Sequence, residues 1–304
     1  MKLRLLTGMA LALAVALVAL HGPAVAGAGS DAGADANVGA GTDPGTGTRV
    51  TTQRPLWELG IGVAGVHLPD YRGSDESRSY VLPLPFIVYR GQWLKADREG
   101  ARALLFDSER IKVDVSLAAT TPTRSRNNAA REGMPDLAAT AEIGPNLNLT
   151  LAGSSSQRYR VDLRLPVRAA IAVQGSPKIV GATFSPHLNL DVDSVAGGWH
   201  LGVLAGPMFG DRRLHDYVYG VDAIYATSAR PAYRASGGYA GWQALTATSR
   251  RFGNLWVGAF LRYDSLRGAV FEISPLVRRT SAATFGLGLA WVLAASSELV
   301  ASED

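Results

Sequence analysis

The residue types that most often carry out chemistry are thinly spread along this chain. His67, His187, His200 and His215 lie far apart, without the H-x-x-x-H or H-x-E spacing that brings two metal ligands together. Ser185 is two residues from His187, so in an extended strand both share one face, as a serine hydrolase on a barrel wall would require. Residues two apart in a strand are about 6.6 Å apart, too far for a direct hydrogen bond between those side chains. The spacing predicts neither a metal site nor a catalytic serine.

Two further patterns imitate binding sites. Asp70, Asp75 and Glu76 bring three carboxylates together, but they lack the spaced ligands of a calcium loop. A solvated turn is the simpler interpretation of these residues. The glycines of GIGVAG, residues 60–65, imitate a nucleotide loop but lie in a strand pattern rather than in a strand-to-helix turn. Close packing within a sheet accounts for them, and no cofactor is expected.

Alternation of apolar and polar residues with period two dominates the rest of the chain. In RYRVDLRLPVRAAIAV, residues 158–173, the apolar side chains fall on one face and the charged ones on the other. IKVDVSLA (111–118) and AEIGPNLNLTL (141–151) repeat the pattern. Twelve such segments are predicted between residues 57 and 293, so the fold class is all-β. Alternation alone fits either a soluble β fold or a membrane barrel, because it does not say which face points inward.

The lengths of the connections favour a transmembrane antiparallel β-barrel of about twelve strands. If the first strand runs outward, the connections near residues 90, 107, 153, 194 and 251 share one end and are short. The connections at 68–78, 121–136, 211–237 and 266–282 share the other end and are long, which is the asymmetry of outer-membrane barrels. Most segments reach about eleven residues, which at 45° tilt gives about 25 Å of height, the thickness of the apolar band.

In a membrane barrel the charged faces of these strands must line the lumen. A lysine or arginine turned to lipid at mid-membrane costs roughly 2 to 4 kcal/mol. We therefore expect opposite charges to pair inside and to close the lumen largely, with little conductance. The residues predicted for this lumen network are Lys112, Asp114, Glu142, Arg160, Asp162, Arg164 and Arg168.

The amino-terminal residues indicate export. Lys2 and Arg4 precede an apolar run, and Ala24-Val25-Ala26 offers an A-x-A cleavage site, so residues 1–26 read as a signal peptide. Residues 27–55 are rich in Gly, Ala and Thr and are predicted to be a flexible linker. The barrel is expected at 56–293 and a carboxy-terminal tail at 294–304. With 30 basic against 26 acidic residues and no basic block, the sequence gives no support to nucleic-acid binding.

Three separated blocks resemble the signatures of the MipA/OmpV family. The first is DYRGSDESRSYVLPLPFIVYRG (70–91), in which Pro83 and Pro85 remove two ladder donors, so we expect imperfect pairing or a bulge there. The second is DYVYGVDAIYATSARPAYRASGGY (216–239), and the third is SPLV (274–277). The matching positions are Tyr71, Gly73, Ser74, Asp75, Pro83, Pro85, Tyr89, Tyr217, Tyr219, Gly220, Arg230, Tyr233, Gly237, Gly238, Ser274 and Pro275.

This resemblance implies a protein of the cell outer membrane, in contact with outer-membrane lipid. It further implies a structural or scaffolding role, because one member is regarded as joining a murein hydrolase, a lytic transglycosylase, to a murein synthase. It transfers no catalytic residue, so no enzyme activity is expected. A small-solute outer-membrane channel is the alternative function.

Two segments outside the strands carry further expectations. The tyrosines and Arg230 of loop 211–237 are too numerous for a solvated tether, so we expect ordered structure over the barrel mouth. A periplasmic partner would meet short turns of about 15 residues in total, fewer than the roughly 20 to 30 per side of a stable interface. We therefore expect such a partner to contact one of the chain ends as well.

Overall fold

The computed structural model describes residues 52–302, apart from 92–93, 98–99, 109 and 154–157. Strands make up most of this part of the chain. They are β1 Thr52–Pro55, β2 Trp57–Pro69, β3 Ser77–Arg90, β4 Leu94–Asp97, β5 Gly100–Asp107, β6 Ile111–Ala119, β7 Thr140–Gly153, β8 Tyr159–Ala172, β9 Lys178–Phe184, β10 His187–Val195, β11 Trp199–Gly210, β12 Gly238–Phe252, β13 Leu255–Ser265, β14 Ser281–Ala295 and β15 Leu299–Ser302.

The helical elements are short and lie in the connections. They are η1 Ser125–Asn127, η2 Ala129–Arg131, α2 Arg212–Tyr219 and η3 Ala223–Tyr225. Among the described residues, no helix has the length and apolar character needed to cross a membrane.

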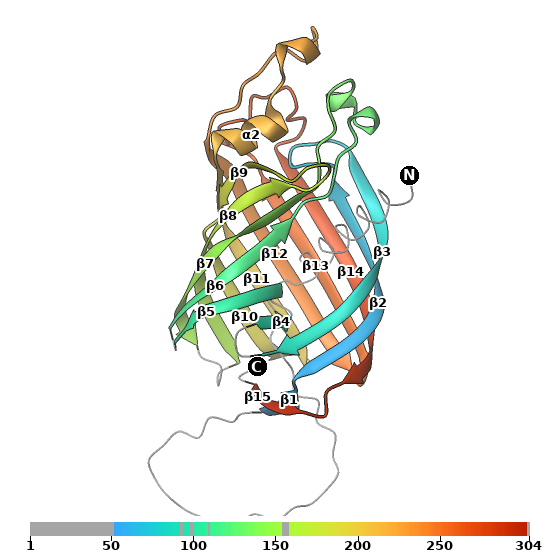
Figure 1. The fold of residues 1–304 in the computed structure, drawn as a ribbon, viewed down its shortest axis with the longest axis vertical. Helices are drawn as coiled ribbons and strands as arrows, with labels where there is room; N and C mark the ends of the chain where they lie inside the picture. Colours follow the sequence, from blue (N-terminus) through green and yellow to red (C-terminus); the bar gives the residue numbers. More distant parts are fainter. Residues whose placement is uncertain (1–51, 92–93, 98–99, 109, 154–157, 303–304) are drawn as a thin grey trace, which may run out of the picture.

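The strands β2 to β14 form one antiparallel sheet that closes into a barrel (Figure 1). The closure is made by β8, which pairs β9 through Val167↔Phe184 and β10 through Arg164↔His187. Both pairs belong to one register, so β9 and β10 are a single strand interrupted at 185–186, where a proline removes a ladder donor. Counted in this way the wall has twelve strands, and the predicted all-β barrel is confirmed.

The apolar face of each strand points outward. In β14, Phe285, Leu287 and Trp291 are exposed, whereas the intervening Gly286 and Ala290 are buried inside. The same alternation holds in β8, where Val167 is exposed and Asp162 is buried. The exterior is therefore apolar around the wall, because period-two alternation on a closed sheet sends every second side chain outward.

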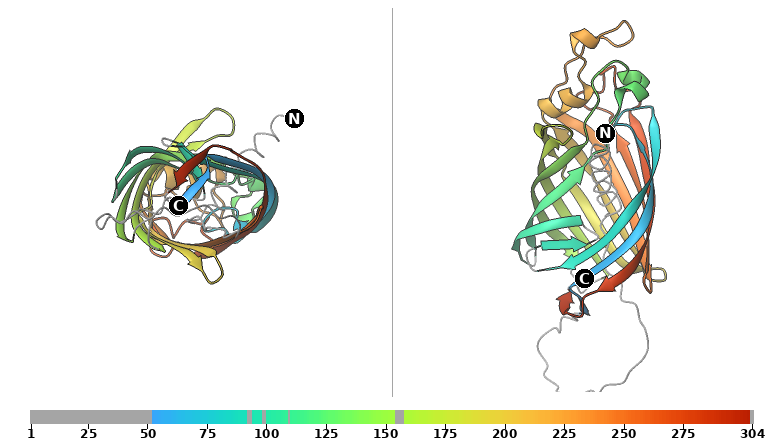
Figure 2. Two further views of the ribbon diagram at one scale, coloured as in Figure 1. Left: turned by 90° about the horizontal axis from the view of Figure 1, so that it is seen from below. Right: turned by 45° about the vertical axis from the view of Figure 1, so that its right-hand side comes forward.

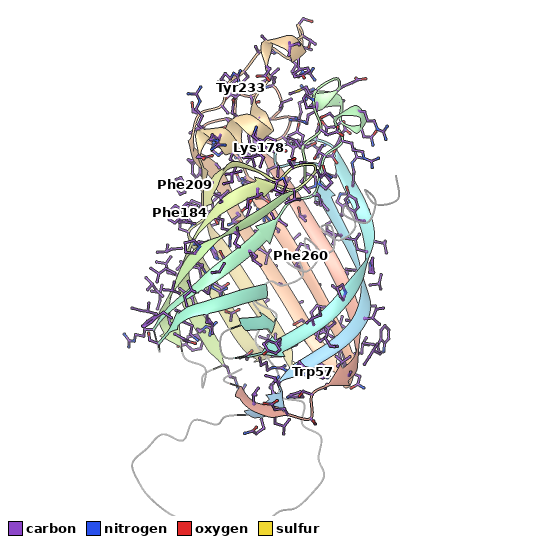
Figure 3. All side chains as sticks on the ribbon, in the orientation of Figure 1. Trp57, Lys178, Phe184, Phe209, Tyr233 and Phe260 are labelled. Carbon is purple, nitrogen blue, oxygen red and sulfur yellow. The ribbon has the colours of Figure 1, made fainter. Side chains whose placement is uncertain are left out.

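The two ends of the barrel differ, and we call them the loop end and the turn end. At the loop end lie the connections 70–76, 120–139, 211–237 and 266–280, with one short hairpin at 173–177. At the turn end the connections described are short, for example 253–254 between β12 and β13. Figure 1 shows α2 and the other loop elements gathered at one end and β1 and β15 at the opposite end. In Figure 3, Tyr233 marks the loop end and Trp57 the turn end.

The expected bulge at Pro83 and Pro85 is absent on the β2 side of β3, whereas on its other side β3 pairs, among the described residues, only at Tyr89 and Arg90. β3 pairs β2 without a register shift from Trp57↔Tyr89 to Pro69↔Ser77. The reason is the direction in which the backbone N–H and C=O groups of β3 point. Arg90 N donates to Leu56 O on the β2 side, so the even-numbered residues of β3 form the backbone hydrogen bonds with β2. The two odd-numbered prolines point their nitrogens to the other edge of β3, where no ladder bond is lost.

Both predicted non-barrel segments contain ordered residues in the described part of the chain. The end of the predicted linker forms β1 and the end of the predicted tail forms β15, and these pair from Thr52↔Ser302 to Pro55↔Leu299. Figure 2 shows this two-stranded ribbon at the turn end, beneath the barrel wall. β14 also extends to Ala295, past the predicted barrel boundary. The predicted signal peptide (1–26) and most of the linker lie outside the described residues.

Candidate functional site

The three signature blocks, far apart in the sequence, meet at the loop end. Tyr71 of the first block donates its hydroxyl to Leu276 O of the third, at 2.8 Å. Ser274 of the third block donates to Tyr219 O of the second, at 2.7 Å. Tyr219 in turn donates to Arg72 O of the first, at 2.9 Å. These hydrogen bonds tie the blocks into one unit, which we call the cap.

The cap has its own hydrophobic core. Phe271 is 1% exposed, stacks on Tyr219 with ring centroids 3.8 Å apart, and meets His215 edge-on at 4.6 Å. Tyr71 and Leu266 are buried beside them. Burial raises the pKa of Tyr219 to about 12, because the phenolate would lose its hydration. The loops at this end are thus packed against one another, which bears out the ordered loop expected at 211–237.

Helix α2 brings His215 and two signature tyrosines into the cap. Asp211 caps its first turn by accepting from Leu214 N at 2.8 Å, and Gly220 N closes its end on Asp216 O. The ring of His215 donates from Nδ1 to Ser236 O at 2.7 Å. Burial lowers the pKa of His215, with the nearby Arg72 acting in the same direction, while this hydrogen bond and Asp211 oppose the shift.

Two arginines fasten the loops of the cap to one another. Arg131 is buried and donates to Val218 O at 2.9 Å, and its guanidinium lies 5.9 Å from the centre of the Tyr71 ring. Arg230 donates to Ala130 O at 3.0 Å and to Glu132 O at 2.9 Å. Since both arginines bond backbone carbonyls, they hold loop 120–139 against loop 211–237 without requiring an acidic partner.

The other signature positions serve turns, edges or contacts of the cap. Gly73 has φ +97, a conformation that favours glycine, and its carbonyl accepts from Arg278 N and Arg279 N. Tyr217 accepts from Ala138 N at 2.9 Å, and Tyr233 donates to Val270 O at 3.4 Å. Gly238, with φ +136, begins β12, and Gly237 precedes it. Ser74 is buried, Asp75 is exposed, Pro275 lies between Ser274 and Leu276, and Tyr89 pairs with Trp57 at the turn end.

The residues predicted for the lumen network face the interior from β6, β7 and β8, in separate groups. Arg160 pairs with Asp162 at 2.9 Å, and Arg164 lies 3.6 Å from Asp162 and 3.8 Å from Asp191 of β10. These ion pairs join residues on one strand or on neighbouring strands rather than opposite walls. Neighbouring strands are about 4.8 Å apart, so these side chains reach one another more easily than they reach the opposite wall.

The remaining predicted lumen residues have polar partners of other kinds. Asp114 accepts from Asn146 at 3.2 Å and from Asn148 at 2.7 Å. The other pairs are Glu142 with Thr183 at 3.2 Å, Arg168 with Ser116 at 2.8 Å, and Lys112 with Asp107 at 3.3 Å. The last pair lies at the turn end of the lumen.

Sequence reasoning missed part of this lumen. Asn189 and Asp191 of β10 are buried and hydrogen-bonded to each other at 2.6 Å, facing β8. Asn146 of β7 was missed in the same way. The signal was present, since all three lie on the polar face of an alternating segment.

Among the described residues, no histidine is hydrogen-bonded both to a serine hydroxyl and to an orienting carboxylate. His200 pairs with Asp193 at 2.8 Å, and the hydroxyl of its cross-strand neighbour Ser249 is buried without a hydrogen-bond partner. His187 bonds the backbone oxygen of Ser185 at 2.8 Å. His67 and Ser79 are hydrogen-bonded at 2.9 Å on the exterior, and His67 stacks on Phe285. No carboxylate or amide side chain orients His67 among the described contacts. Asp70, one of the three clustered carboxylates, is instead paired with Arg78 at 2.5 Å.

Comparison with known protein families identifies the chain. The family model described as MltA-interacting protein MipA matches residues 61–293. The chain belongs to the MipA family. No curated protein matches it. The resemblance carried by the three blocks is thereby confirmed, and the match covers the barrel from β2 to β14 together with the cap.

Proposed function

We propose that this MipA-family barrel lies in the outer membrane and serves as a non-catalytic scaffold for murein-processing enzymes. The observation that carries the proposal is the family match over most of the chain, because the family description names an interaction with MltA. The apolar exterior supports the location, since it matches a surface in contact with lipid hydrocarbon. A signal peptide at 1–26 would direct export to the periplasm.

In this orientation the turn end faces the periplasm and carries the partner surface. The short turns alone offer little area, and the ribbon of β1 and β15 extends that surface. Each strand of the ribbon has one edge that pairs no strand in the described part of the chain. Such an edge is a template to which an extended segment of a partner adds by backbone hydrogen bonds. The proposed partners are a murein hydrolase and a murein synthase.

Affinity capture from detergent-solubilised envelopes tests the scaffold role. Deletion of 296–304 removes β15 while leaving β14 intact, and we expect it to reduce recovery of lytic transglycosylase and synthase activity. Deletion of 28–50 is the matched control, because it removes a longer segment near the other terminus of the chain and leaves both β1 and β15 in place. Both variants must first show a folded barrel by heat-modifiable migration in gels. Equal recovery of murein enzymes by both deletion variants and by the intact chain would rule out the ribbon as the binding surface. Recovery of no murein enzyme by any of the three forms would refute the scaffold role.

The alternative, a small-solute channel, is disfavoured by the packed cap and by the charged pairs on one side of the lumen. The cap packs over the loop end, and buried ion pairs occupy the β8 and β10 side of the lumen. We expect planar-bilayer recordings to show small or no conductance. Large and stable open pores would favour the channel instead.

A further inference from the structure

The wall of the barrel is not paired around its whole height. Beyond β2, β3 pairs only with β4, through Tyr89↔Ala96 and Arg90↔Lys95. On its side facing β5, β6 pairs no further than Ala103↔Val115. Among the described residues, β3 from 77 to 88 and β6 from 116 to 119 therefore have an edge without a strand partner. Figure 1 shows β3 and β6 diverging above the short strands β4 and β5.

This opening is framed at both of its ends, and we call it the window. At the turn end it is bounded by β4 and β5. At the loop end the connection 120–139 crosses to the β2–β3 loop: Thr123 donates to Asp70 O at 2.5 Å, and Asn128 donates to Asp70 at 2.9 Å and to Ser74 at 3.0 Å. Arg78 at the start of β3 completes the crossing by donating to Asn127 O at 2.5 Å. The buried side chains at this crossing fix the two margins relative to each other.

The window edge of β3 is unsuited to pairing with another strand. Its odd-numbered residues direct their backbone groups to this edge, and two of them, Pro83 and Pro85, bring no N–H. Proline on an open edge prevents the addition of a strand from a second copy or from a partner protein. An occupant of the window must therefore associate without a ladder of backbone hydrogen bonds.

The inner wall behind the β3 margin is apolar. Leu84 and Phe86 of β3 point inward with Ala64 of β2, and Phe86 meets Trp256 of β13 with ring centroids 5.9 Å apart. Phe260 belongs to the same cluster, and in the view of Figure 3 it lies in the region between β6 and β3. Glycines make room for these rings, because a Cβ on Gly286 would meet Phe260 and one on Gly258 would meet Trp256. The opposite part of the lumen holds the charged groups described above.

The outer margins of the window are apolar as well. Val81 and Ile87 on β3 are 78% and 45% exposed, and Leu117 on β6 is 43% exposed. Apolar side chains thus line both the outer margins of the window and the inner wall, where Phe86 is partly buried and Leu84, Trp256 and Phe260 are buried. We propose that an acyl chain of a membrane lipid enters through the window and lies on this inner wall. The inference rests on the membrane location proposed above.

Quenching of tryptophan fluorescence by lipids brominated in the acyl chain tests the proposal. The chain has six tryptophans; among those that the structure describes, Trp256 alone belongs to the apolar inner wall, whereas Trp291 is exposed on the exterior. Two single-tryptophan variants, one keeping Trp256 and one keeping Trp291 with the others changed to Phe, are placed in nanodiscs of brominated phosphatidylcholine. We expect Trp256 to lose a fraction of its fluorescence comparable to that lost by Trp291.

Each other outcome overturns a distinct part of the reasoning. Quenching of Trp291 but not of Trp256 refutes entry of the acyl chain and leaves the location intact. Quenching of neither refutes the membrane location itself. Quenching of Trp256 only by brominated stearate added from water refutes the membrane lipid as the source of the acyl chain. Quenching of Trp256 only by aqueous acrylamide shows a water-filled lumen and refutes the acyl chain as its occupant.

A matched pair of substitutions on β2 separates entry from quenching through the wall. Ala64→Phe adds a ring to the inner wall and is expected to abolish quenching of Trp256. Gly65→Phe adds the same ring on the exterior, where a Cβ has no heavy atom within 4 Å, and is expected to leave quenching unchanged. If Ala64→Phe does not fold, the comparison of Trp256 with Trp291 still decides the question. Equal quenching in two folded variants would refute the inner-wall site.

Discussion

The packing of the cap is most sharply tested at Phe271. Its ring is 1% exposed and lies against Tyr219 and His215. Phe271→Ala removes this ring, and truncation of a buried phenylalanine costs about 3 to 5 kcal/mol. Because the ring contacts lie within the cap, we expect the cap to open while the barrel stays folded.

Limited proteolysis measures this opening. Trypsin sites such as Arg212, Arg213 and Arg234 lie in loop 211–237, which Phe271 contacts through Tyr219 and His215. When opening and closing are fast relative to cleavage, the cleavage rate follows the open population. At 1.36 kcal/mol per tenfold change, a loss of 3 kcal/mol increases cleavage by about 10²-fold.

Ile273→Ala is the matched control, because Ile273 is two residues away and 85% exposed. Substitutions at exposed positions usually change stability by no more than about 0.5 kcal/mol, so we expect its cleavage rate to change less than about threefold. Heat-modifiable migration verifies the barrel in both variants. Equal cleavage of the Phe271→Ala and Ile273→Ala variants would refute the interpretation of the cap as one packed unit.

Three further predictions concern the cap, the edge of β3 and the lumen. Burial lowers the pKa of His215 in the closed cap, so His215 binds a proton more readily when the cap is open. As the pH falls below about 6.5, protonation therefore favours the open cap, and tryptic cleavage at the loop end should increase. In urea unfolding, Pro83→Ala should change the free energy of unfolding by less than about 1 kcal/mol. Leu84→Ala, in the inner wall, should lower the free energy of unfolding by about 2 to 5 kcal/mol. Asp162→Ala should destabilise the barrel by about 1.5 to 3 kcal/mol, because it removes a buried carboxylate that pairs with Arg160 and lies 3.6 Å from Arg164.

Each of these predictions has its own control. His215→Asn keeps a donor for Ser236 O but does not titrate in this range, so the rise in cleavage at low pH should disappear. A Pro83→Ala variant as destabilised as Leu84→Ala would contradict the assignment of the proline nitrogen to the open edge. For the lumen, Thr150→Val removes only the hydrogen bond that the hydroxyl donates to Asp162 and leaves the ion pair with Arg160, so it should cost less than Asp162→Ala. A cost equal to that of Asp162→Ala would exclude a charge effect.

Much of the wall was predictable from residue types alone. The alternation in 158–173 assigned Arg160, Asp162 and Arg164 to one polar face, and in the structure both arginine side chains lie within ion-pair distance of Asp162. Sequence can assign such a face because neighbouring residues of a strand point to opposite sides, which is a local property of the backbone. Ordered structure in loop 211–237 was also predictable, because its tyrosines are too apolar for a solvated tether.

Pairing between distant segments was less accessible to the sequence. The prolines of β3 were expected to disturb its pairing, yet their nitrogens point away from β2, and only the register through Arg90 N reveals this. The ends of the predicted linker and tail were assigned to no strand, yet β1 and β15 pair with each other. Neither segment contains the partner that orders it.

The sequence therefore determined the strand periodicity, the face that each strand presents and the family, because these depend on short stretches and their order. The tertiary structure alone decided which edges meet. Closure of the barrel by β8 on β9 and β10, the unpaired margins of β3 and β6, and the union of Tyr71, Tyr219 and Ser274 in the cap all depend on the register of strands around a closed sheet. Register between distant segments is set by the sum of many weak contacts, and no single segment encodes it.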